Sequence, residues 1–335
     1  VMTSIFENTH SKVTIHILHD ETLTRENKQR FICTAEKYSH GLEFHDITEY
    51  KYLIGDTLTK ITKIWTIGTL YRMFIPDVIP SCLDKVIYLD CDILVNLDIR
   101  ELWEINLEDK SIAGALDPLH YAKSSPTYYQ IKLVVGSAES YINAGVTIMN
   151  LRKIREIKDF CGICVDWLLK HSHFRIFPDQ DMLNAIFLND IKIIDPKFNV
   201  FADIHNTMQD ISDKIIHVNG SRSKPWKYFY GCQHDHLYWK MFLRSAWGQN
   251  ITPEELIDIF CNLTCQSPLI HASYKDCVKS ILSKACNKFC GKFKIVGLII
   301  KNMYYKFKYR FTHSLHTQQS SKLQHSPSRH ALAAG

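Results

Sequence analysis

Two aspartates separated by one residue follow an apolar stretch of the chain. Asp90 and Asp92 come directly after Lys85-Val-Ile-Tyr-Leu89, whose composition predicts a buried strand. If both carboxylates reach one cation, their hard oxygen atoms suit Mg²⁺ or Mn²⁺, and such a cation can bind a diphosphate. Because open α/β sheets bind ligands at the carboxyl ends of their strands, this position favours a metal site. The alternative is a turn with solvated acidic side chains.

A histidine and a basic loop occur together further along the chain. His217 ends a short apolar run and can serve as a borderline ligand for Mn²⁺. Gly220 lets the backbone approach a phosphate, and Lys224 supplies a positive charge for it. The alternative is a histidine with ordinary hydrogen-bond partners, followed by a surface turn.

Two further motifs place polar or small residues at the expected start of an element. Asp179 and Gln180 begin a predicted helix, where a carboxylate and an amide can line a sugar site or act only as caps. Asn143, Ala144 and Gly145 begin a predicted strand, where small residues permit the close approach of a sugar. The alternative for Gly145 is a bulge or tight packing.

Strands and helices must position these motifs, and the first half of the chain alternates the two patterns. Short apolar or β-branched runs predict strands at residues 13–18, 42–47, 85–89, 141–149, 192–194 and 214–217. Apolar residues at helical spacing predict helices at residues 21–38, 70–74, 151–171, 179–188 and 253–259, the last with Thr252 as N-cap. Such alternation indicates an α/β fold around a mostly parallel sheet.

In this order, the motifs resemble those of glycosyltransferase family 8. The resemblance covers roughly residues 1–250 and rests on Tyr71-Arg72, Tyr88-Leu-Asp-Cys-Asp-Ile93, Ala115-Leu-Asp117, Asn143-Ala-Gly145, Asp179-Gln-Asp181 and His217-Val-Asn-Gly-Ser-Arg-Ser-Lys-Pro-Trp226. The family contains retaining lipooligosaccharide galactosyltransferases, lipopolysaccharide glucosyl- and galactosyltransferases and glycogenin. It implies a GT-A fold, with a Rossmann-like, mostly parallel sheet, helices on both faces and the nucleotide at the carboxyl edge.

The resemblance also implies a role for each matching residue. The ligands of Mn²⁺, which Mg²⁺ can replace, are Asp90, Asp92 and His217. The residues at the nucleotide diphosphate are Asp90, Cys91, Asp92, Gly220 and Lys224. Those around the donor hexose are Arg72, Asp117, Asn143, Ala144 and Gly145. The candidates for catalysis are Asp179 and Gln180.

A member of this family is expected to move glucose or galactose from a UDP-sugar, with retention, to a lipopolysaccharide, lipooligosaccharide or other surface glycan built on a lipid-linked oligosaccharide. Gln180 occupies the family's candidate nucleophile position but is a poor nucleophile, which favours same-face attack. The resemblance also implies a first strand that carries the uridine contacts, and this sequence does not show it, so we expect a start set too late, a removed N-terminus or a defective copy. A second hypothesis is therefore a degenerate, non-catalytic family member that binds glycan or membrane.

The charge of the chain is unevenly distributed. Residues 275–310 contain ten Lys and Arg against one acid, Asp276, a net charge of +9 within a total of +5. Aromatic residues are interleaved with these charges through residue 311, which suits the surface of an anionic membrane. The alternative is a helical pair with a solvated basic face. No nucleic-acid-binding motif occurs, so we expect no nucleic acid partner.

Composition predicts where the protein is located, and changes of composition along the chain predict its domains. Cys residues number 11 in scattered positions, and no run of 18 apolar residues and no signal peptide is visible, which favours a cytoplasmic protein. We expect it to lie peripherally on the inner face of a bacterial cytoplasmic membrane. The predicted domains are a catalytic domain over residues 1–250, a basic and aromatic helical segment over 251–313 and a disordered tail over 314–335.

Overall fold

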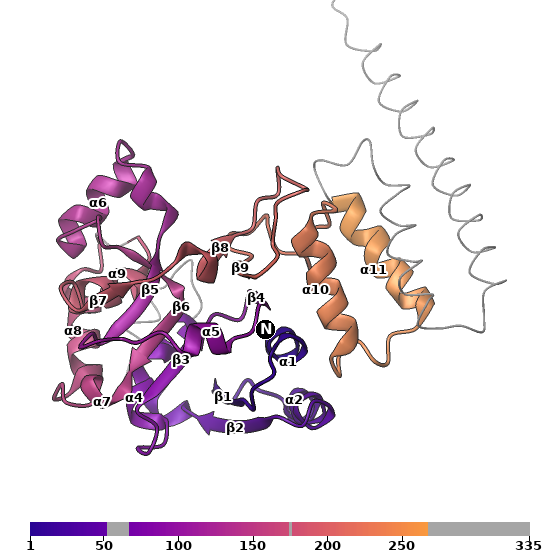
Figure 1. Cartoon of the computed structure of the whole chain (residues 1–335), viewed down its shortest axis with the longest axis horizontal. Helices are drawn as coiled ribbons and strands as arrows, with labels where there is room; N and C mark the ends of the chain where they lie inside the picture. The colour runs from indigo at the N-terminus through magenta and orange to yellow at the C-terminus, as the bar shows by residue number, and fades with distance from the viewer. Residues whose placement is uncertain (52–66, 174–175, 267–335) are drawn as a thin grey trace, which may run out of the picture. The chain divides into compact units, whose positions relative to one another are not determined.

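The computed structural model describes residues 1–51, 67–173 and 176–266 (Figure 1). The basic segment predicted to bind membranes, residues 275–311, and the tail from residue 314 lie outside these described ranges. Within them, no helix is long and apolar enough to cross a membrane.

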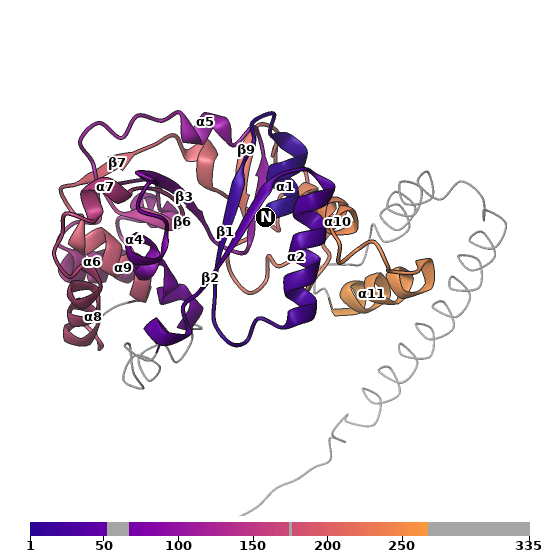
Figure 2. The same cartoon turned by 90° about the horizontal axis from the view of Figure 1, so that it is seen from below.

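A parallel strand pair and its crossover helix form the first part of the fold. The elements are β1 (Thr14–His19), α2 (Arg25–Lys37) and β2 (Gly41–Asp46). Figure 2 shows α2 beside the two strands, and Phe31 of α2 meets Phe44 of β2 edge-on. Parallel strands require such a crossover because the carboxyl end of the first strand and the amino end of the second lie at opposite edges of the sheet. The two strands and the helix predicted in this region are confirmed.

The central sheet has four strands in the order β3-β6-β5-β7. Their bounds are β3 (Lys85–Leu89), β5 (Ile112–Leu116), β6 (Ile142–Asn150) and β7 (Ile191–Ile193). A smaller sheet contains β4 (Ile93–Asn96), β8 (Val200–Phe201) and β9 (Lys214–His217). Three strand pairings among the described residues are parallel (β1 with β2, β5 with β7, β8 with β9), and three are antiparallel (β3 with β6, β5 with β6, β4 with β9). The sheet system is therefore mixed.

Helices pack on both faces of the central sheet. Along β3, Val86 and Tyr88 contact one apolar cluster and Ile87 and Leu89 contact another, because successive side chains of a strand point to opposite faces. The first cluster includes residues of α8 (Phe160–Lys170) and α9 (Pro178–Ile186). The second includes residues of α1 (Met2–Asn8). This layering confirms the α/β fold.

Nine further helical segments lie in the described residues. They are η1 (Ile67–Phe74), α4 (Ile75–Val78), α5 (Arg100–Trp103), η2 (Pro118–Tyr121), α6 (Pro126–Val135), α7 (Leu151–Ile154), η3 (Pro196–Asn199), α10 (Gln233–Arg244) and α11 (Pro253–Gln266). The single helix predicted over residues 151–171 was wrong. Asp159 adopts a left-handed conformation (φ 54°) and its side chain accepts a hydrogen bond from Gly162 N, so α8 begins anew. Thr252 caps α11 as predicted, accepting from Glu255 N at 3.1 Å.

Candidate functional site

Sheet pairing brings the three predicted metal ligands together. Asp90 follows β3 and its backbone N–H donates to Gly145 O at 2.8 Å. Asp92 precedes β4, and its carbonyl accepts from Val218 N at 3.1 Å, next to the pair Ile93 and His217 in the β4–β9 ladder. His217 Nε2 consequently lies 3.2 Å from Asp92 Oδ1 and 3.9 Å from Asp90 Oδ2.

The donor atoms of this cluster fit a divalent cation. Asp92 Oδ1 is buried and no described residue hydrogen-bonds to it, although His217 Nε2 is close. On the other side of the ring, His217 Nδ1 lies 3.1 Å from Asn199 Oδ1, while Asn199 Nδ2 donates to Asn143 Oδ1 at 2.8 Å. Because Asn199 therefore presents its oxygen, the histidine proton belongs on Nδ1 and the Nε2 lone pair faces the carboxylates.

Gly145 makes room for two of these ligands. A Cβ atom at this position would lie 2.4 Å from His217 Cε1 and 3.0 Å from Asp90 Oδ2. Real Cβ atoms do not approach ring atoms so closely, so any larger residue would displace a ligand side chain. The glycine of the Asn143-Ala-Gly145 motif is thus explained by the close approach of two predicted metal ligands, His217 and Asp90.

The basic loop predicted to contact a diphosphate borders the same cluster. Lys224 Nζ pairs with Asp92 Oδ2 and donates to Val218 O at 2.7 Å. Burial opposes ionisation of Asp92, but the adjacent Lys224 ammonium favours the charged carboxylate and holds the pKa of Asp92 below its ordinary value. Gly220 has a φ of 83° with open space around its α-carbon, so its backbone conformation explains the glycine. Cys91 is exposed between the two aspartates.

Arg72 connects the metal ligands to the predicted sugar site. Its guanidinium is 2% exposed, and Nη2 lies 2.8 Å from Asp90 Oδ1 and 2.8 Å from Asp179 Oδ2. Nη1 donates to Ala144 O at 2.6 Å, and the group stacks over the Tyr88 ring at 4.2 Å. Burial works against the charge, yet the neighbouring carboxylates raise the pKa of Arg72 above its ordinary value. The arginine therefore carries a positive charge that bridges two carboxylates.

A buried hydrogen-bond network contains the other predicted sugar-site residues. Gln180 Nε2 donates to Asp117 Oδ2 at 3.0 Å, and Gln180 Oε1 accepts from Asn143 Nδ2 at 2.9 Å and from Ala144 N at 3.0 Å. Asn143 Nδ2 also lies 3.0 Å from Asp117 Oδ2. The amide orientation of Gln180 is fixed at both ends, because a carboxylate can only accept and a backbone N–H can only donate. The structure thus joins Asp117, Asn143 and Gln180 in one network, and the Ala144 carbonyl links that network to Arg72.

The second Asp-x-Asp motif of the chain does not hold a metal pair. Asp181 accepts hydrogen bonds from Tyr141 OH and from the backbone N–H groups of Ile176 and Phe177. Its Oδ2 therefore holds the loop before α9 and its Oδ1 accepts from Tyr141, whereas Asp179 faces Arg72. The two motifs share the same spacing, but the sequence places one after a strand and the other at a helix start, and the structure shows that their side chains have different partners.

Sequence reasoning missed three groups of polar residues. Asn199 lies behind His217 and gave no signal beyond its residue type. The cluster Cys232, His234 and Asp235 lies at the start of α10, where Asp235 Oδ2 accepts from Cys232 N at 3.1 Å as part of a cap. The third group is His16, Glu43 and His45 on the β1–β2 pair.

Comparisons with known proteins agree with this geometry. The family model described as glycosyl transferase family 8 matches residues 1–229. An Escherichia coli lipopolysaccharide 1,2-glucosyltransferase is 29% identical over 67% of this chain and 67% of its own length. A Salmonella typhimurium lipopolysaccharide 1,3-galactosyltransferase is 26% identical over 66% of each chain.

A solved structure supports the same fold. The galactosyltransferase LgtC, crystallised with donor and acceptor sugar analogues, superposes with a TM-score of 0.62 at 21% identity over 77% of this chain and 93% of that one. The chain spans 57% and 60% of the lengths of two other bacterial relatives. Since the family model matches about two thirds of the chain, this protein belongs to glycosyltransferase family 8 and has the GT-A fold.

Proposed function

We propose that this chain is a retaining hexosyltransferase that moves glucose or galactose from a UDP-sugar to a lipopolysaccharide, lipooligosaccharide or related surface glycan, with Mn²⁺ as cofactor. One observation carries the proposal: Asp90, Asp92 and His217 converge beside Lys224, and Arg72 links that cluster to the Asp179 carboxylate. In this proposal, the cation site and the sugar site would therefore adjoin each other. The lipopolysaccharide transferases among the relatives support this choice of substrates.

A cation held by the cluster, together with Lys224, would supply positive charge where the leaving group develops negative charge. Asp90, Asp92 and His217 would hold the Mn²⁺, which when bound neutralises a diphosphate. Lys224, held by Asp92 and the Val218 carbonyl, would meet the phosphates from the loop side. Such preorganised charges usually give the largest part of transition-state stabilisation.

The hydrogen bonds of the sugar site favour same-face attack over a covalent intermediate. Gln180 Oε1 already accepts two hydrogen bonds, so its lone pairs are engaged. Asp179 is paired with the buried guanidinium of Arg72, and separating such a pair costs about 3–5 kcal/mol. In the reaction we propose, the UDP oxygen accepts the acceptor's proton while these residues hold the hexose. A glycosyl adduct trapped on Asp179 or Gln180 would contradict this mechanism.

The acceptor side of the proposal involves the basic segment. Its ten Lys and Arg over residues 275–310 would each contribute about 1 kcal/mol near an anionic surface. We propose that this segment holds the enzyme peripherally on the inner face of a bacterial cytoplasmic membrane, where a lipid-linked oligosaccharide is extended. Sedimentation with vesicles of anionic and of zwitterionic lipid, with and without residues 275–335, tests this part.

The donor reaction is tested by UDP release from UDP-glucose and UDP-galactose, with Mn²⁺ and with EDTA. We expect Mn²⁺-dependent release that is lost in Asp92→Ala and retained in Asp109→Ala, an exposed acid outside the site. The preferred hexose is the one released faster. Absence of binding and cleavage for both nucleotide sugars in the folded protein would refute the donor assignment and favour the non-catalytic family member that binds glycan or membrane.

A further inference from the structure

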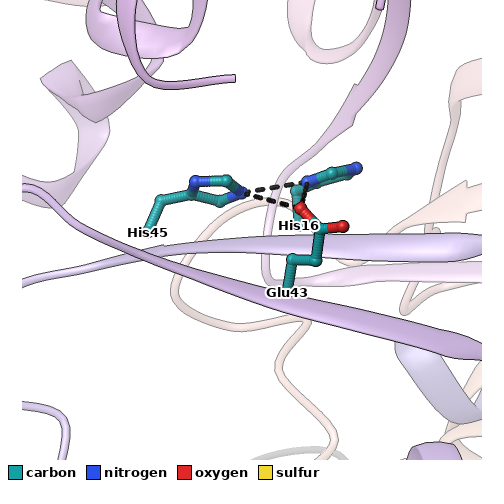
Figure 3. Close-up of side chains that lie close together, drawn as sticks. All are labelled: His16, Glu43 and His45. Carbon is teal, nitrogen blue, oxygen red and sulfur yellow. Dashed lines mark hydrogen bonds and ion pairs between the residues drawn. The ribbon is translucent and has the colours of Figure 1, made fainter. Parts of the chain in front are cut away.

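Three potential metal ligands project from one face of the β1–β2 pair, outside the residues of the proposed transfer reaction. His16 on β1 lies opposite Glu43 on β2, and His45 follows two residues later on the same face. Figure 3 shows the two rings and the carboxylate pointing toward one another. His16 Nδ1 is 2.9 Å from His45 Nε2 and 3.3 Å from Glu43 Oε2, and the last two atoms are 3.9 Å apart.

Protons satisfy this arrangement only in part. A neutral imidazole nitrogen carries either one proton or one lone pair, so His16 Nδ1 must share one proton between His45 and Glu43 or accept a proton from His45 while its lone pair faces the Glu43 carboxylate. A cation at the centre would accept a lone pair from all three groups at once.

The separations match the size of a coordination sphere. A triangle with sides of 2.9, 3.3 and 3.9 Å has a point about 2.0 Å from every corner. Zinc binds imidazole nitrogen at about 2.0–2.1 Å and carboxylate oxygen at about 2.0–2.2 Å, so an ion at or just above that point reaches all three atoms. Glu43 is 50% exposed while the two rings are 14% exposed, so further positions are open to water.

We propose that His16, Glu43 and His45 form a second divalent-cation site, selective for Zn²⁺ and similar transition metals. Two imidazoles with one carboxylate suit such borderline ions, whereas the two carboxylates and one imidazole of Asp90, Asp92 and His217 suit harder Mn²⁺. An ion in this site joins β1 to β2, so it stabilises the folded state by an amount that grows with the logarithm of the free ion concentration above the Kd.

Equilibrium dialysis of the full chain against Zn²⁺ tests the proposal. We expect the wild type to bind one equivalent more than the double variant His16→Gln, His45→Gln, while the exposed control His205→Gln matches the wild type. The comparison cancels zinc bound by cysteines and by the C-terminal histidines. Equal zinc binding by the wild type and the double variant would overturn the inference.

A milder variant keeps the test decisive if the double variant does not fold. Glu43→Gln changes a half-exposed side chain, and unfolding in EDTA confirms its fold. Removing a direct ligand should weaken zinc binding by more than the ~10–100-fold loss that follows removal of an outer partner. An unchanged zinc affinity in Glu43→Gln would contradict the site as strongly as equal stoichiometry.

Discussion

Gly145→Ala probes the metal cluster with the smallest available change. The new Cβ would meet His217 Cε1 at 2.4 Å, His217 Nδ1 at 2.8 Å and Asp90 Oδ2 at 3.0 Å. The His217 ring is buried and its Nδ1 contacts Asn199, so it has little freedom to move aside. We therefore expect the methyl group to displace a ligand of the cation.

The size of the effect follows from the clash. Overpacking a tightly packed site typically costs about 1–3 kcal/mol. If that cost falls on the ligand geometry, it corresponds to a loss of about 5- to 150-fold in Mn²⁺ affinity, at about 1.4 kcal/mol for each factor of ten. The remainder of the cost would lower the free energy of unfolding.

Electron paramagnetic resonance of free Mn²⁺ measures the affinity without any assumption about turnover. Gly114→Ala is the matched control, because its Cβ in the adjacent strand would lie 2.7 Å from the end of the Ile142 side chain and would touch no ligand. Both variants should lose stability, but only Gly145→Ala should lose Mn²⁺ affinity. Wild-type Mn²⁺ affinity in a folded Gly145→Ala protein would refute the reasoning.

Three other perturbations follow from the same contacts. Asn199→Ala removes the acceptor that fixes the His217 tautomer, so Mn²⁺ affinity should fall about 10–100-fold by the same resonance assay, and Asn199→Asp should restore part of it. Arg72→Met leaves two carboxylates without their shared buried cation, so the free energy of unfolding in urea should fall by about 3–5 kcal/mol, and a smaller loss than in an exposed Arg25→Met control would contradict the bridge. Burial raises the pKa of Asp235 from 3.8 to about 6, so the folded state binds this proton more tightly than the unfolded state. Stability from this group is complete below pH ~4 and should decline by about 3 kcal/mol as the pH rises to ~6, and this decline should be absent in Asp235→Asn when urea unfolding is compared across that range.

Much of the fold was predictable because it depends on local patterns. The apolar run of β3 predicted a strand that ends at two carboxylates, and the structure places Asp90 and Asp92 there with His217 beside them. Thr252 capped the predicted helix because an N-cap needs only its own side chain and the next turn. The break between α7 and α8 was missed because Asp159 adopts a left-handed conformation that the helical spacing of the apolar residues does not reveal.

The sequence by itself determined which residue types were available and which ended a strand or began a helix. Only the tertiary structure decided that His217 meets Asp92, that Asn199 lies behind it, and that Asp181 serves a loop instead of a cation. The same holds for His16 beside Glu43, which depends on the register of β1 against β2. The physical reason is that strand and helix patterns arise from neighbours along the chain, whereas a site joins residues from separate elements, such as Asp92 and His217, through sheet pairing that a shift of one residue would undo.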